Sequence, residues 1–188
     1  MIRKNPTILK IIERLTGSGQ GILQRNFRRG DLVIRQGADT TAVFFIRAGI
    51  VKCTFGADNG KEYILEFLGE GQVLGELEAI GGMAAMSSVH AISELAVYML
   101  DKGSFLDLLR RNTELNTAML ELMARRLTDT ALRSAKQQLN TLEHNLAQLL
   151  DALQQENLPC TKQELADYLG ITLRSLNRMM RDRGMGTC

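Results

Sequence analysis

Three arginines near the carboxyl end of the chain, Arg174, Arg178 and Arg181, have the spacing of residues on one face of a helix. At about 100° per residue, Arg178 lies about 40° to one side of Arg174 and Arg181 about 20° to the other. The opposite half of this helix carries the apolar side chains Leu173, Leu176, Met179 and Met180. Guanidinium groups bind guanine O6 and N7 in the major groove, or phosphate oxygens. The predicted chemistry is therefore recognition of duplex DNA by a helix.

The residues before this helix predict the element that positions it. Thr161 and Glu164 have the spacing of a capping box, which starts a helix by satisfying its free amide groups. We expect that helix over 162–169, followed by a tight turn at Gly170 and a second helix capped by Thr172. Helix, short glycine-containing turn and helix together form a helix-turn-helix.

The positive charge of the chain is concentrated in one segment near the carboxyl end. The formal net charge is only +2, whereas residues 172–183 contain four arginines and one aspartate, a local charge of +3. An ordinary solvated basic helix would show the same charge, but not the capping box and turn glycine in register with it. No apolar run reaches the roughly 20 residues that span a bilayer, so we expect no membrane segment and a cytoplasmic protein.

The sequence offers few candidate residues for a disulfide framework, a metal site or a catalytic site. The three cysteines, Cys53, Cys160 and Cys188, are far apart and odd in number, which argues against a disulfide framework or a CxxC metal site. Two histidines are too few for a metal-dependent enzyme on a cupin-like fold, so we predict no metal and no cofactor. Neither a Ser-His-Asp set nor a paired-carboxylate motif is apparent, and we predict that the chain is not an enzyme.

Short apolar runs separated by glycines occupy the region from Asn26 to Leu100 and predict strands. The runs are 32–34, 43–46, 50–51, 63–65 and 95–100. Asn59-Gly60 lies between two of them and predicts a hairpin. Strands at this spacing indicate a β-roll.

Helical periodicity replaces this pattern from Phe105 to about Leu139, where Leu108, Leu115 and Leu122 recur every seven residues. This helix could pack on its own β-roll or pair with its copy in a second subunit, and the spacing alone leaves both possibilities open. A further amphipathic helix is predicted over 140–155, and another near the amino terminus around Ile8 to Ile12.

Several motifs, taken in order, resemble the catabolite-activator and fumarate-nitrate-regulator family of transcription factors. They are Phe27-Arg28-Arg29-Gly30-Asp31, Phe45-Ile46-Arg47-Ala48-Gly49, Gly75-Glu76-Leu77, Met123-Ala124-Arg125-Arg126-Leu127 and the stretch from Thr161 to Gly170. The resemblance covers nearly the whole chain. It implies an α+β fold with a cyclic-nucleotide-binding-type β-roll over 1–104, a long dimerisation helix over 105–139 and a helix-turn-helix DNA-binding domain over 140–188.

The resemblance also implies partners and site residues. A homodimer would place two recognition helices in successive major grooves of double-stranded DNA, so the target would be an imperfect palindrome, and RNA polymerase is a further partner. The DNA-binding residues would be Thr161, Lys162, Thr172, Leu173, Arg174, Ser175, Arg178 and Arg181. The dimer interface would contain Leu108, Leu115, Met119, Leu122 and Arg126.

The effector site implied by the resemblance departs from the family pattern. Its residues would be Gly75, Glu76, Leu77, Ser87 and Ser88. Members that bind cyclic AMP hold its phosphate with an arginine-serine pair, and Ala85 and Met86 occupy those positions here. Because burying a phosphate without a cationic partner is costly, we expect an unidentified effector other than cyclic AMP.

The carboxyl end is a second departure, because the family continues into a two-stranded wing where this chain has only 184–188. Loss of backbone contacts from a wing would weaken DNA binding and reduce its salt dependence. The alternative function is therefore an effector- or partner-binding module whose DNA reader is inactive.

Overall fold

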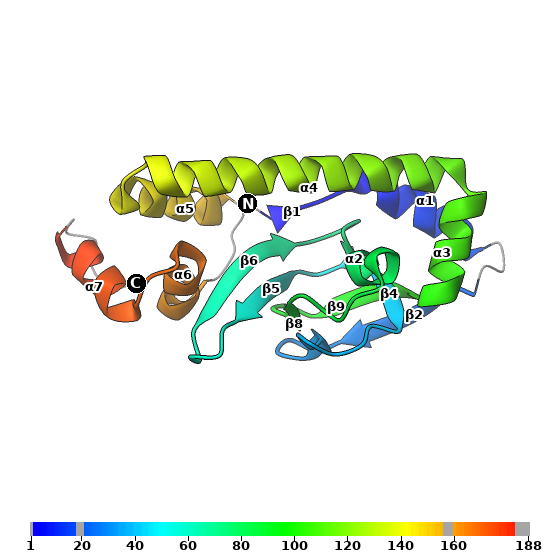
Figure 1. Ribbon diagram of the computed structural model, residues 1–188, viewed down its shortest axis with the longest axis horizontal. Coiled ribbons are helices and arrows are strands. Elements are labelled where there is room, and N and C mark those ends of the chain that lie inside the picture. Colours follow the sequence, from blue (N-terminus) through cyan, green and yellow to red (C-terminus); the bar gives the residue numbers. More distant parts are fainter. Residues whose placement is uncertain (1, 18–20, 156–159, 183–188) are drawn as a thin grey trace.

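The computed structural model describes residues 2–17, 21–155 and 160–182, and Figure 1 shows a β-roll below one long helix with a small helical unit at one end. The strands are β1 (Ile2–Arg3), β2 (Leu23–Phe27), β3 (Leu32–Ile34), β4 (Ala42–Ala48), β5 (Val51–Gly56), β6 (Glu62–Leu68), β7 (Val73–Leu74), β8 (Ser88–Ala91) and β9 (Leu95–Asp101). The helices are α1 (Pro6–Thr16), α2 (Glu76–Gly81), α3 (Lys102–Arg111), α4 (Thr113–Leu139), α5 (Leu142–Gln155), α6 (Lys162–Leu169) and α7 (Leu173–Asp182). The stretch 183–188, where a wing was expected to be missing, lies outside the described residues.

The β-roll consists of two sheets with strand orders β1-β6-β5-β8-β3 and β2-β9-β4-β7. Alternate residues of a strand face opposite sides of its sheet, and the inward-facing ones of both sheets form one apolar core. Phe44, Ile46 and Val97 of the four-stranded sheet meet Val51 and Val89 of the five-stranded sheet in this core. The predicted α+β fold class with a β-roll is confirmed.

Most apolar runs in the sequence mark real strands, and the hairpin predicted at Asn59-Gly60 joins β5 to β6. These two strands are antiparallel, and the Gly60 amide donates to the Ala57 carbonyl at 2.9 Å across the turn. Strands β1, β2 and β7 were not predicted from the sequence. In β2, four of the five residues are exposed, so no apolar run marks this strand.

A second core joins α1, α3 and α4 to the four-stranded sheet. Ile8, Ile11 and Ile12 of α1 lie in this core, as expected from the amphipathic pattern at the amino terminus. The helix predicted over 105–139 is divided at Asn112, which ends α3 and caps α4 by accepting a hydrogen bond from the Leu115 amide at 2.8 Å. None of the helices in the described part of the chain has both the length and the hydropathy needed to span a membrane.

The apolar residues expected at a dimer interface lie inside the protomer. Their side chains are at most 6% exposed and pack on α1 and the β-roll, and they are Leu108, Leu115, Met119 and Leu122. A seven-residue repeat on an amphipathic helix fits its own sheet as well as a second helix, so spacing alone did not separate the two. The solvent-exposed leucines of α4 are Leu120, Leu127, Leu132 and Leu139.

A third core attaches α5, α6 and α7 to strand β6 of the roll. Leu146, Ala166 and Leu176, one from each helix, are fully buried and share this core with Ile64 and Phe67 of β6. The small helical unit therefore lies directly against the five-stranded sheet at the end of α4 (Figure 1).

Candidate DNA-reading surface and effector site

The helix-turn-helix forms through local contacts that the sequence predicted. Thr161 and Glu164 make the reciprocal capping box: the Thr161 hydroxyl accepts from the Glu164 amide at 3.2 Å, and the Glu164 carboxylate accepts from the Thr161 amide at 2.9 Å. Gly170 ends α6 with a left-handed backbone, φ +69°, which favours glycine. Thr172 starts α7 by accepting a hydrogen bond from the Ser175 amide at 3.1 Å.

Helix α7 has one buried and one exposed face, as the angular analysis predicted. Leu176, Met179 and Met180 are at most 8% exposed and pack in the third core. The side chains of Arg174, Arg178 and Arg181 are exposed, and none of them forms an ion pair with a side chain that the structure describes. Leu173 was expected either to contact a base or to pack; it is 37% exposed and stays at the edge of the basic face. Three guanidinium groups that have no ion-pair partner among the described side chains therefore face solvent together.

The remaining residues predicted to bind DNA lie at the starts of the two helices. Thr161 and Thr172 are exposed, whereas Lys162 and Ser175 are half-buried. The Ser175 hydroxyl is 2.9 Å from that of Thr172, so both are engaged within the turn. The structure thus brings all eight predicted residues to α6, α7 and the positions that cap them.

An ion pair links α6 to the β-roll. The Lys52 ammonium of β5 lies 2.8 Å from the Glu164 carboxylate. Burial alone would raise the pKa of Glu164, but hydrogen bonds from Lys52 and Thr161 hold it below its ordinary value. Glu164 therefore caps α6 and also attaches it to the roll, a second role that the local sequence did not indicate.

The centre of the predicted effector site is Glu76, and the structure pairs it with a residue from α4. Arg126 donates to the Glu76 carboxylate, to Gln72 Oε1 at 2.8 Å and to the Val73 carbonyl at 3.0 Å. The side chains of Glu76 and Arg126 are 3% and 13% exposed. Arg126 was expected at the dimer interface, but it lies instead between α4 and the roll of its own protomer.

This pairing sets the electrostatics of the site. Burial raises the pKa of the Glu76 carboxyl, and the guanidinium of Arg126 opposes that rise. Arg126 and Gln72 could not be assigned to this site from the sequence, because Arg126 lies 50 residues from Glu76 and 54 from Gln72 and no local pattern connects them. A buried pair of opposite charges leaves no net charge to offset a bound anion.

The other residues predicted around Glu76 divide between backbone and surface roles. Gly75 has φ +81°, and a Cβ there would lie 2.8 Å from the Ala42 carbonyl, so glycine is required sterically. Leu77 is exposed, and Ser87 and Ser88 are half-buried. The Ser88 hydroxyl already accepts from the Gln36 amide at 3.0 Å.

Several known proteins similar to this chain over most of its length are regulators of transcription. Residues 24–112 match the cyclic nucleotide-binding domain family. The "CRP-like cAMP-activated global transcriptional regulator" of Mycobacterium tuberculosis is 26% identical over 169 residues, which cover 84% of this chain and 75% of that protein. The "Transcriptional activator protein FnrA" of Stutzerimonas stutzeri is 24% identical over 174 residues, covering 82% of this chain and 68% of the relative.

The fold agrees with these matches. The solved structure of CLP, described as a c-di-GMP responsive global regulator of Xanthomonas campestris, superposes with a TM-score of 0.82 at 17% identity and covers 94% of this chain and 91% of CLP. Residues 24–112 are therefore similar to the cyclic nucleotide-binding domain family, and the chain is similar in sequence to Crp/Fnr-type transcription regulators and shares the fold of CLP.

Proposed function

We propose that this chain is a sequence-specific DNA-binding transcription regulator that acts as a homodimer in the bacterial cytoplasm. The observation that carries the proposal is the exposed face of α7, where Arg174, Arg178 and Arg181 have no described acidic partner. Arg174 and Arg178 would contact bases in the major groove, with Leu173 and Ser175 beside them. Arg181, Thr161, Lys162 and Thr172 would hold phosphates.

The dimer would form along the exposed side of α4, which Figure 1 shows at the edge of the molecule with the roll on its other side. Leu120, Ala124, Leu127, Ala131 and Ser134 are all exposed and follow the alternating spacing of four and three residues that a coiled coil requires. Leu120 and Leu127 are 64% and 73% exposed, a cost that a second copy of α4 would remove. Alanine and serine between the leucines allow the two helices to approach closely.

Two such readers would contact half-sites about 34 Å apart, so the target would be an imperfect palindrome. RNA polymerase would be the partner of a regulator bound at a promoter.

The β-roll would hold a small-molecule effector other than cyclic AMP. The positive charge of Arg126 is already matched by Glu76. Ala85 is buried and Met86 exposed at the positions where the resemblance places the phosphate-binding pair. A cyclic phosphate would thus bring an uncompensated charge into the site. Isothermal titration with cyclic AMP should show no binding, and a micromolar affinity would contradict this proposal.

Fluorescence anisotropy with labelled genomic fragments, measured over a salt series, tests DNA recognition. Arg174→Ala and Arg178→Ala should each lower the discrimination between fragments, by about 1–3 kcal/mol for a base contact. Lys162→Ala should weaken binding to all fragments and reduce the salt slope by about 1.8, for two contacts per dimer at about 0.9 each. Arg25→Ala, at an exposed arginine of β2, is the control and should bind like the wild type.

The same anisotropy measurement distinguishes sequence-specific DNA recognition from the alternative function. Weak binding that is equal for all fragments and unchanged in Arg174→Ala would refute sequence-specific recognition. It would instead favour an effector- or partner-binding module with an inactive reader.

A further inference from the structure

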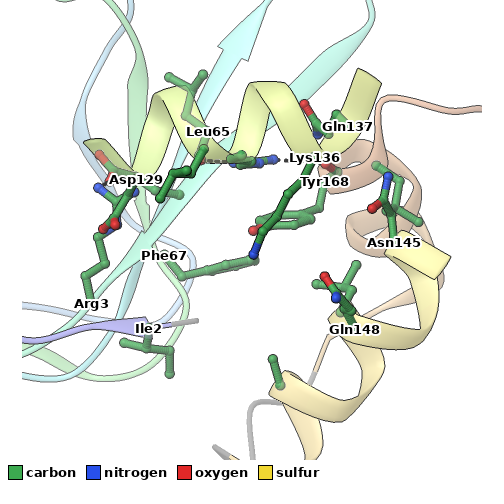
Figure 2. A pocket seen from close by; sticks show the side chains of 16 residues that line it. Ile2, Arg3, Leu65, Phe67, Asp129, Lys136, Gln137, Asn145, Gln148 and Tyr168 are labelled. Atoms are coloured by element: carbon green, nitrogen blue, oxygen red, sulfur yellow. Dashed lines mark hydrogen bonds and ion pairs between the residues drawn. The ribbon is translucent and has the colours of Figure 1, made fainter. Parts of the chain in front are cut away.

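A pocket of about 460 Å³ lies between the β-roll and the helix-turn-helix unit. Its walls come from β1 and β6 of the roll, from the carboxyl-terminal half of α4, and from α5 and α6 (Figure 2). None of its lining residues belongs to the predicted effector site around Glu76. The volume is within the range of roughly 300–1,000 Å³ that small-molecule sites occupy.

One wall of this junction pocket is apolar and held in place by several contacts. The rings of Phe67 and Tyr168 stack with centroids 6.0 Å apart and an interplanar angle of 19°. The Arg133 guanidinium lies 3.9 Å from the centroid of the Tyr168 ring and donates to the carbonyls of Ile64, at 2.9 Å, and Tyr168, at 3.0 Å. Since these bonds join α4, β6 and α6, the aromatic wall exists before any ligand binds.

Polar side chains also line the pocket, and one of them carries a positive charge without a described ion-pair partner. Arg3 is balanced by Glu66 at 2.9 Å and Asp129 at 3.6 Å. Lys136 reaches from α4 toward Phe67 (Figure 2) and forms no ion pair with a described residue. The amides of Asn145 and Gln148 line the pocket from α5 (Figure 2). The Gln148 amide nitrogen is already 3.0 Å from the His144 ring, so an anionic group in this pocket would rely mainly on the cation of Lys136.

We propose that this junction pocket binds a small amphiphilic anion, with an aromatic or apolar body against Phe67 and Leu149 and its anionic group at Lys136. Such a ligand would contact the roll through β6 and the helix-turn-helix unit through α5 and α6. The ligand would thus influence the contact between the β-roll and the helix-turn-helix unit, at a place separate from the site around Glu76.

Two fluorescent probes of matched shape test this site. 1-Anilinonaphthalene-8-sulfonate carries aromatic rings and one sulfonate, and N-phenyl-1-naphthylamine is the same body without the sulfonate. Wild-type protein should bind the sulfonate probe saturably, at one site per protomer. In Lys136→Met its dissociation constant should rise about fivefold, as for the loss of one partly exposed charge contact, while binding of the neutral probe should stay unchanged.

Ala152→Trp, which fills the pocket from α5, should abolish saturable binding of both probes. Lys10→Met, at an exposed lysine of α1, is the control and should bind both like the wild type. Equal affinity of the sulfonate probe for wild type and Lys136→Met would overturn the proposal. Unchanged binding in a folded Ala152→Trp variant would do the same. Because no DNA is present, this result is independent of whether the chain recognises DNA.

Discussion

Replacing Arg126 by methionine tests the buried ion pair that joins α4 to the β-roll. The substitution keeps an unbranched side chain of similar length but removes the guanidinium group, which donates to three acceptors: the Glu76 carboxylate, the Gln72 amide oxygen and the Val73 carbonyl. The Glu76 carboxylate, 3% exposed, would remain buried without its cation. Breaking a buried pair in this way costs about 3–5 kcal/mol of unfolding free energy.

Arg125→Met provides a matched control one residue away. The Arg125 guanidinium is 65% exposed and lies 3.2 Å from Glu121 one turn earlier on the same helix. Exposed pairs of this kind contribute about 0.3–0.5 kcal/mol. Urea unfolding followed by circular dichroism, at one protomer concentration for all variants, should therefore separate the two substitutions by several kcal/mol.

The pH dependence of the stability lost in Arg126→Met shows whether the buried charge of Glu76 causes that loss. Burial raises the pKa of Glu76 in the wild type, and removing Arg126, which opposes that rise, should raise it further in the variant. A carboxyl whose folded pKa lies above its unfolded value of about 4.3 favours the folded state less as pH rises through the folded pKa. The deficit of Arg126→Met should thus be larger at pH 8 than at pH 5.5.

A second substitution should relieve the penalty. Combining Arg126→Met with Glu76→Gln removes the buried charge, so the double variant should regain most of the lost stability. If Arg126→Met costs no more than Arg125→Met, or if its deficit is the same at both pH values, the buried ion pair is not what holds α4 on the roll.

Two further predictions concern the exposed face of α4 and the link between α6 and the roll. Leu127→Lys should shift the chain from dimer to monomer in sedimentation velocity, while Leu23→Lys, at another exposed leucine, should leave the dimer intact; a dimeric Leu127→Lys variant would exclude this face. Burial would raise the pKa of Glu164, but Lys52 and Thr161 hold it below its ordinary value. The ion pair between Glu164 and Lys52 should therefore stabilise the fold above about pH 4.5. This stabilisation should be lost as the pH falls through the folded pKa of Glu164. Glu164→Gln should therefore lower the Tm at pH 7 and lose less on acidification than the wild type, whereas Glu143→Gln, exposed on α5, should follow the wild-type curve.

The sequence by itself determined the elements that depend on neighbouring residues. The capping box at Thr161, the turn at Gly170 and the two faces of α7 involve partners three or four residues apart, so helix geometry alone fixes them. The hairpin at Asn59-Gly60 and the apolar strands of the roll are equally local. Strand β2 was not predicted, because most of its residues are exposed and it has no apolar run.

Only the tertiary structure decided which face of α4 is buried, because its leucines occupy both sides of the helix. It also brought Arg126 to Glu76, 50 residues away, and Arg133 to the backbone of β6, 68 and 69 residues away. Pairings of this kind depend on how the helices dock on the sheets and leave no periodic trace along the chain. The basic face of α7 was thus visible in the residue order, whereas the Glu76–Arg126 pair and the junction pocket exist only in the folded protein.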